Sequence, residues 1–143
     1  MAKQISELNW KKRLVVISFE KKEDKIFLST QKFIRENECS INDRNLEFIF
    51  YEKFKNSEYE APNFIINKLG IWLIGYDGAI KDYSKDDKIY LSLFSLIDSM
   101  PMRKNEMIND KCYITNIKYF HKYFSQFHYR LSKILHSYTA TFA

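Results

Sequence analysis

Short apolar runs separated by polar stretches form the main pattern of this chain. Three such runs occupy residues 14–19, 46–51 and 71–74. Apolar runs of this length between polar segments are typical of buried strands. Asp77 and Gly78 follow the third run and form a strong turn signal, so residues 79–82 are expected to return as a fourth strand.

The segments between these runs carry the signals of helices. Apolar side chains recur at helical spacing at Ile26, Phe27, Phe33 and Ile34. Their spacing predicts a helix that ends near Glu36. A second, short helix is predicted over residues 63–69, where Gly70 would end it. A third is predicted over residues 88–100, because Pro101 disfavours the helical conformation at the residue before it.

The order of these elements predicts an α/β fold for residues 1–110. Strands and helices alternate, and the chain finishes with a hairpin and a helix. The first two connections are crossovers, which favour parallel pairing, while the hairpin favours an antiparallel edge. This is the layout of a thioredoxin-like three-layer sandwich, with a mixed central sheet and helices on both faces.

From Tyr113 the chain changes character. Apolar side chains recur every three or four residues at Ile117, Phe120, Phe124, Phe127, Leu131, Ile134 and Tyr138. This spacing predicts an extra C-terminal amphipathic helix within residues 111–143. We expect it to pack on the domain's own sheet, or on a partner subunit or other protein partner through a helical seam. Membrane-surface or nucleic-acid binding has weaker support, and no nucleic-acid partner is predicted.

The charge and composition sharpen this division of the chain. The net charge is +5, yet residues 1–110 hold 18 basic and 18 acidic residues. The whole excess therefore lies in residues 111–143, which contain no acid. A hydrophobic content of 45% over 143 residues excludes general disorder and suits one packed domain.

The cysteines and the first ten residues indicate the cellular compartment in which the protein is expected. Cys39 and Cys112 lie far apart, which favours two free thiols, although a disulfide between them stays open. Residues 1–10 hold no apolar run, and no stretch approaches the roughly 20 apolar residues of a spanning helix. We expect a cytoplasmic protein as the sequence is written, exported only if a leader was removed.

Two motifs resemble a known family. Residues 73–81, with the sequence LIGYDGAIK, resemble the hairpin LIGKDGGVK of the bacterial family DUF4174. Residues 97–107, IDSMPMRKNEM, resemble the ending IDAMPMR..EM of the same family, and the resemblance extends over about residues 8–107. It implies a thioredoxin- or peroxiredoxin-like fold without an established reaction. The chain departs from the family in Tyr76, which replaces a lysine, and in lacking a proline before Ile71.

Thiol chemistry in such a fold needs a cysteine at the start of the first helix, where the helix N-terminus lowers its pKa. Residues 19–25 contain no Cys, Ser or Thr, and residues 68–71 contain no proline that could face such a cysteine. Cys39 lies beyond the first predicted helix. The sequence therefore predicts no redox activity, no cofactor and no metal site.

The candidate binding residues lie at the start of the first strand, in the hairpin and in the Met-Pro-Met-Arg segment. They are Arg13, Asp77, Lys81, Asp98, Met100, Pro101, Met102, Arg103 and Glu106. An internal ion-pair network among Asp98, Arg103 and Glu106 is favoured over a ligand site. We expect a non-catalytic binding or interaction module. The alternatives are an enzyme with a non-thiol site near these residues, or an oxidoreductase that uses an atypical cysteine.

Overall fold

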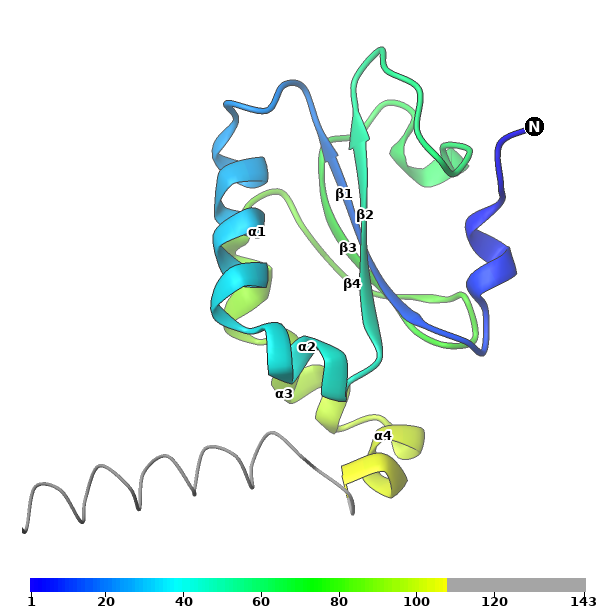
Figure 1. The fold of residues 1–143 in the computed structure, drawn as a ribbon, viewed down its shortest axis with the longest axis vertical. Coiled ribbons are helices and arrows are strands. Elements are labelled where there is room, and N and C mark those ends of the chain that lie inside the picture. Colours follow the sequence, from blue (N-terminus) through cyan, green and yellow to red (C-terminus); the bar gives the residue numbers. More distant parts are fainter. Residues whose placement is uncertain (108–143) are drawn as a thin grey trace, which may run out of the picture. The chain divides into compact units, whose positions relative to one another are not determined.

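Strand β1 (Arg13–Phe19) lies at the centre of the computed structural model, which describes residues 1–107 (Figure 1). All seven of its residues are buried. The run of β-branched and aliphatic side chains explains this position, because both faces of a central strand must be apolar. The other strands are β2 (Leu46–Glu52), β3 (Gly70–Ile74) and β4 (Ile80–Ser84).

The four strands form one mixed sheet in the order β2-β1-β3-β4. β1 and β2 are parallel, as the first crossover predicted, with Val16 opposite Ile49. β3 is antiparallel to both β1 and β4. Parallel pairing for the second crossover was therefore a wrong prediction. The chain between β2 and β3 contains only the short 3-10 helix η2 (Asn63–Ile65), and β3 enters the sheet from the opposite end.

Three α-helices lie over one face of the sheet (Figure 1). They are α1 (Lys25–Glu36), α2 (Glu38–Asp43) and α3 (Leu93–Asp98), joined there by the 3-10 helix η3 (Asp87–Leu91). Val15, Ile17 and Leu73 form the sheet side of this core. Inside it, the hydroxyls of Thr30 and Tyr90 lie 2.6 Å apart, so two buried polar groups satisfy each other.

The opposite face is covered by 3-10 helices rather than by α-helices within residues 1–107. η1 (Ile5–Leu8) and η2 pack there against a second core. Trp72 is buried in this core between Phe64 and Tyr83, with ring centroids 5.4 and 4.8 Å away. Helices were expected on both faces of the sheet; α-helices cover one face, and the other carries only short 3-10 helices within residues 1–107.

Helix boundaries differ from expectation after the hairpin. The predicted helix over residues 88–100 is divided at Ser92 into η3 and α3. Met100 is extended, and Pro101 begins a further helix, α4 (Pro101–Glu106), that was not predicted. A proline suits the first position of a helix because the amide hydrogen it lacks would have no partner there. α2 was also missed, since six residues carry little periodicity.

Gly70 was predicted to end a helix, but it is the first residue of β3. Its φ of +145° is unfavourable for other residues, and a Cβ there would lie 2.6 Å from the Ser84 carbonyl oxygen. The predicted turn after β3 is present, with Gly78 at a φ of +77°. Backbone conformation therefore requires glycine at both positions.

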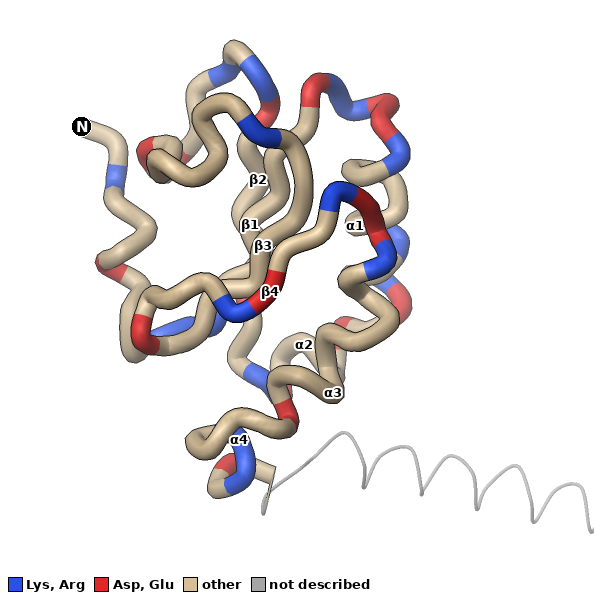
Figure 2. The backbone as a smooth tube through the Cα atoms, turned by 180° about the vertical axis from the view of Figure 1, so that it is seen from behind, with Lys and Arg blue, Asp and Glu red and all other residues tan. Residues whose placement is uncertain are grey.

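Charged residues of both signs are interspersed along the described backbone (Figure 2). No helix within residues 1–107 is long and apolar enough to cross a membrane. The amphipathic helix and the second domain predicted over 111–143 lie outside the described residues.

Candidate functional site

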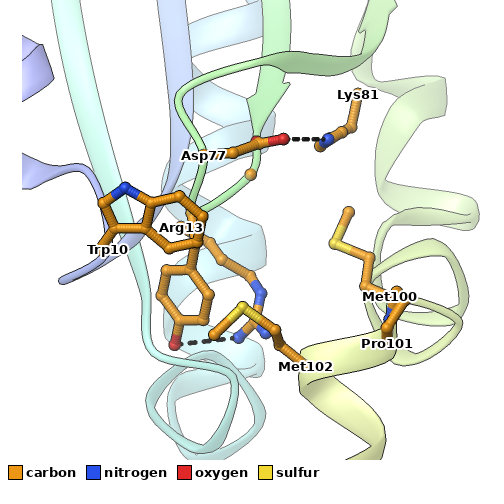
Figure 3. Close-up of a pocket in the computed structure, with 9 residues that line it drawn as sticks. Trp10, Arg13, Asp77, Lys81, Met100, Pro101 and Met102 are labelled. Carbon is orange, nitrogen blue, oxygen red and sulfur yellow. Dashed lines mark hydrogen bonds and ion pairs between the residues drawn. The ribbon is translucent and has the colours of Figure 1, made fainter.

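A pocket of about 180 Å³ lies between the β3–β4 hairpin and the start of α4 (Figure 3). Three segments distant in the sequence converge there: the residues that enter β1, the hairpin, and the Met-Pro-Met segment. The lining residues are Trp10, Arg13, Gly75, Tyr76, Asp77, Lys81, Met100, Pro101 and Met102.

Trp10 is held at the mouth of the pocket by its backbone. Its φ is +64°, and its amide donates a 2.8 Å hydrogen bond to the carbonyl oxygen of Tyr76. A left-handed conformation is unfavourable for a bulky residue and is kept only where the surroundings fix it. The indole remains 68% exposed, so a large apolar surface is available at this site.

Arg13 forms the buried wall of the pocket and is only 1% exposed. Its Nη1 and Nη2 donate to the carboxylate of Glu106 at 3.0 and 3.2 Å, and Nη1 also donates to the carbonyl oxygen of Arg44 at 2.8 Å. The guanidinium carbon lies 4.1 Å from the ring centroid of Tyr76. These contacts compensate the burial of a charge that would otherwise be strongly unfavourable.

One polar atom of this wall is not satisfied. Nε of Arg13 is buried and makes no hydrogen bond within the described chain. Buried donors are nearly always paired, so this one adds to the desolvation cost of burying Arg13.

The hairpin side of the pocket carries an ion pair that fixes the turn. Nζ of Lys81 lies 2.9 Å from Oδ2 of Asp77, whose Oδ1 accepts a hydrogen bond from the amide of Ala79. These two contacts lower the pKa of the Asp77 carboxyl, with the Lys81 hydrogen bond as the largest cause. Asp77 is therefore an ionised turn residue and a weak base.

Met100, Pro101 and Met102 supply the third side. Met100 packs on the α-helical core, whereas Met102 is 49% exposed. Pro101 fixes the direction in which the chain leaves Met100 and enters α4. Thioether side chains are polarisable and adapt their shape, so this side of the pocket can fit a range of apolar groups.

Beneath the pocket, a buried ion-pair network anchors α4. Nε of Arg103 lies 3.0 Å from Oδ1 of Asp98, and Nη1 lies 3.5 Å from the carboxylate of Glu106. Arg103 also pairs with the carboxylate of Asp43, while Arg44 holds Asp98 at 2.7 Å. The predicted network of Asp98, Arg103 and Glu106 is present and extends to α2.

The pKa values of this network follow from its geometry. Burial opposes ionisation of Asp98, but hydrogen bonds from Arg44 and Arg103 outweigh it and lower the pKa of the carboxyl. Burial likewise opposes the charge on Arg103, yet Asp43 and Asp98 raise its pKa. Asp98 and Arg103 are therefore both charged near neutral pH.

The segments that build the pocket and its network also carry the family motifs. The profile described as "Domain of unknown function (DUF4174)" matches residues 4–106, which is most of the chain and includes every residue of the pocket. The chain belongs to the DUF4174 family. No curated protein and no solved structure matches it.

The structure brings the predicted site residues of this DUF4174 domain together. Six of them line the pocket: Arg13, Asp77, Lys81, Met100, Pro101 and Met102. The other three, Asp98, Arg103 and Glu106, lie in the network beneath it. Sequence reasoning missed Trp10, Gly75 and Tyr76 as lining residues, although all three belong to the segments that matched the family.

The loop after β1 in this DUF4174 domain is fixed by hydrogen bonds to Asp24. Oδ2 of Asp24 accepts the backbone amides of Glu20 and Lys21 at 3.0 and 3.2 Å. Cys39 lies in α2 and is not a free thiol, contrary to expectation. Cys112 lies outside the described residues. Within residues 1–107, no group of His, Cys, Asp and Glu residues has the arrangement of a metal site.

Proposed function

We propose that this DUF4174 domain is a non-catalytic interaction module that receives an apolar side chain of a protein partner in the pocket beside Arg13. The observation that carries the proposal is the composition of the pocket. Trp10, Tyr76 and Arg13 line it together with two methionines. Tryptophan, tyrosine and arginine are the residues most enriched at the energetic centres of protein interfaces.

The size of the pocket supports a side chain as its occupant. Cavities that enclose a cofactor or a drug-sized metabolite measure roughly 300–1,000 Å³. At about 180 Å³, this pocket is smaller than that range. A single large apolar side chain suits it better than a whole cofactor.

The charges around the pocket support an uncharged occupant. Arg13 is paired with Glu106, and Asp77 is paired with Lys81. The surface left between these pairs belongs to Trp10, Met100 and Met102. A charged ligand would have to compete with existing ion pairs, whereas an apolar side chain would displace water from apolar surface.

Two alternatives have less support. An enzyme with a non-thiol site near Asp77 and residues 100–103 would need a base whose pKa is raised toward neutral pH, whereas that of Asp77 is lowered. An oxidoreductase with an atypical cysteine would need a reactive thiol, and Cys39 is not free.

We propose that the fold is thioredoxin-like. The support is the order β2-β1-β3-β4, together with a parallel β1–β2 pair joined by α1 and an antiparallel β3–β4 hairpin followed by helices. A fold of this kind without its cysteine motif retains a scaffold on which other binding sites can be built.

The proposal is tested by selecting peptides from a random library displayed on phage and measuring their affinity by fluorescence anisotropy. Selected peptides should share a bulky apolar residue, and Met102→Asp should abolish their binding. Leu91→Asp is the matched control because Leu91 is exposed and lies outside the pocket. Peptides that bind both variants equally would refute the proposal, and loss of binding in Asp77→Asn would favour the hairpin carboxylate as the site.

A further inference from the structure

A second cavity, of about 620 Å³, lies at the other end of the sheet, where β1 and β2 finish. It is bounded by Ser18 of β1, by the chain that follows β2, and by residues 65–69 before β3. Its volume is within the range of sites that enclose a small molecule. Crevices at the carboxyl ends of parallel strands are a common location of such sites in α/β sheets.

The rim of this cavity is unusually apolar for a surface loop. Phe54 is 96% exposed, Ile66 is 61% exposed and Leu69 is 38% exposed. Phe54 also has a φ of +62°, a left-handed conformation that a bulky residue rarely adopts. A loop that holds an aromatic ring outward beside a cavity has the form of a binding surface.

The cavity is also lined by a hydroxyl that has no hydrogen-bond partner among the described residues. Ser18 is 7% exposed, lines the cavity, and its hydroxyl makes no hydrogen bond to any described residue. The neighbouring strand residue Tyr51, by contrast, donates its hydroxyl hydrogen to the carbonyl oxygen of Glu60. A hydroxyl that makes no hydrogen bond within the fold can donate to a bound acceptor without losing a contact.

The charge of the cavity is positive and centred on Lys68. Lys53 and Lys55 also line the wall, but they pair with Glu20 and Glu52 at 3.2 and 3.0 Å. Lys68 has no acidic partner within residues 1–107, and its Nζ lies 3.8 Å from the ring centroid of Tyr83. Lys68 lines the cavity, and no carboxylate of the described residues competes for its charge.

We propose that this cavity binds a small organic anion with an apolar body, such as a medium-chain carboxylate. The apolar body lies against Phe54, Ile66 and Leu69, and the carboxylate is attracted by Lys68 and accepts a hydrogen bond from Ser18. The site is separate from the pocket beside Arg13, with which it shares no lining residue. The proposal for this cavity is therefore independent of the interaction proposed for the pocket beside Arg13.

The probe is dodecanoate, compared with dodecyltrimethylammonium and dodecyl maltoside, which present the same alkyl chain with a cationic or uncharged head. Each is titrated into the full chain below its micelle concentration and followed by calorimetry and by amide chemical shifts. Dodecanoate should bind most tightly and shift the amides of Ser18, Phe54 and Lys68. Equal affinity for all three, shifts elsewhere, or no binding of dodecanoate would overturn the proposal.

Variants separate the contributions of the charge and the hydroxyl. Lys68→Met should weaken dodecanoate binding about fivefold and Ser18→Ala about tenfold, while binding of the maltoside changes little. Lys88→Met is the matched control, because Lys88 is an exposed lysine outside the cavity. Affinity unchanged in both Lys68→Met and Ser18→Ala would overturn the assignment, and so would Lys88→Met if it matched Lys68→Met.

Discussion

Arg103 and Asp98 form an ion pair across the break between α3 and α4, with Nε of the buried guanidinium 3.0 Å from Oδ1 of the carboxylate. The pair lies directly beneath the pocket that contains Met100 and Met102. It fixes the short segment between the two helices, because Arg103 also reaches the carbonyl oxygen of Asp43 in α2 at 2.9 Å. The shape of the pocket therefore depends on a contact between two residues that do not line it.

Arg103→Met should destabilise the fold strongly. The variant preserves much of the side-chain volume but leaves the carboxylates of Asp98 and Asp43 without this partner. Removing one member of a buried ion pair typically costs about 3 kcal/mol or more. Urea unfolding followed by circular dichroism measures the change. Lys104→Met, at an exposed position in the same helix, should change the free energy of unfolding far less; similar losses in both variants would show that the network is not stabilising.

The stability of the wild-type chain should fall in acid partly through Asp98. The pKa of its carboxyl lies below the ordinary value of 3.8 in the folded chain. The ionised form therefore stabilises the fold, fully so above that value, and this contribution is lost as the pH falls through the lowered folded pKa.

The free energy of unfolding of wild type should thus decrease more steeply below about pH 4 than that of Asp98→Asn, which cannot ionise there. Urea unfolding between neutral pH and strong acid measures both slopes. Glu23→Gln, at an exposed carboxylate without an ion pair within residues 1–107, should keep the wild-type slope. Parallel curves for wild type and Asp98→Asn would contradict the lowered pKa.

Gly70→Ala should be much more harmful than Gly75→Ala. At Gly70 the φ is +145° and a Cβ would lie 2.6 Å from a backbone oxygen, so both strain and collision oppose the change. At Gly75 the collision is with the end of the flexible Lys81 side chain, which can move. In thermal or urea unfolding, we expect Gly70→Ala to lower the free energy of unfolding by roughly 2 kcal/mol or more. We expect Gly75→Ala to lower it by less than about 1 kcal/mol. The opposite order would contradict the described geometry of β3.

The full chain should not accelerate the reduction of insulin by dithiothreitol. The loop after β1 contains no cysteine, and its Glu20 and Lys21 amides donate hydrogen bonds to the carboxylate of Asp24. Turbidity of insulin at neutral pH measures the rate, with thioredoxin as the positive control. Acceleration that disappears in Cys39→Ser would instead support the atypical oxidoreductase.

Local sequence signals were sufficient for the elements that carry a long apolar run, a helical spacing of apolar side chains or a strong turn pair. The buried run of β1, the helical spacing of Phe27 and Phe33, and the turn at Asp77 and Gly78 belong to this class. The short helices α2 and α4 do not, because one or two turns leave no periodicity to detect. Pro101 was interpreted as the end of a helix, although the same residue also begins the next one.

Neither the direction of β3 nor the contacts between the site residues could be predicted from local signals. β3 follows a long connection whose only helix is three residues long, so nothing in it specifies a parallel crossover. Arg13 and Glu106 are separated by 93 positions, and their contact is a property of the folded chain alone. The candidate residues were found because the family motifs contain them, whereas their convergence on one pocket required the structure.

The two tryptophans of the chain differ sharply in environment. Trp72 is enclosed between Phe64 and Tyr83, while Trp10 is open to solvent at the mouth of the pocket. Their emission should therefore separate into a blue component that iodide does not reach and a red component that iodide quenches. An occupant of the pocket would protect only the second component, so the molecule contains its own optical reporter of binding beside an internal reference for folding.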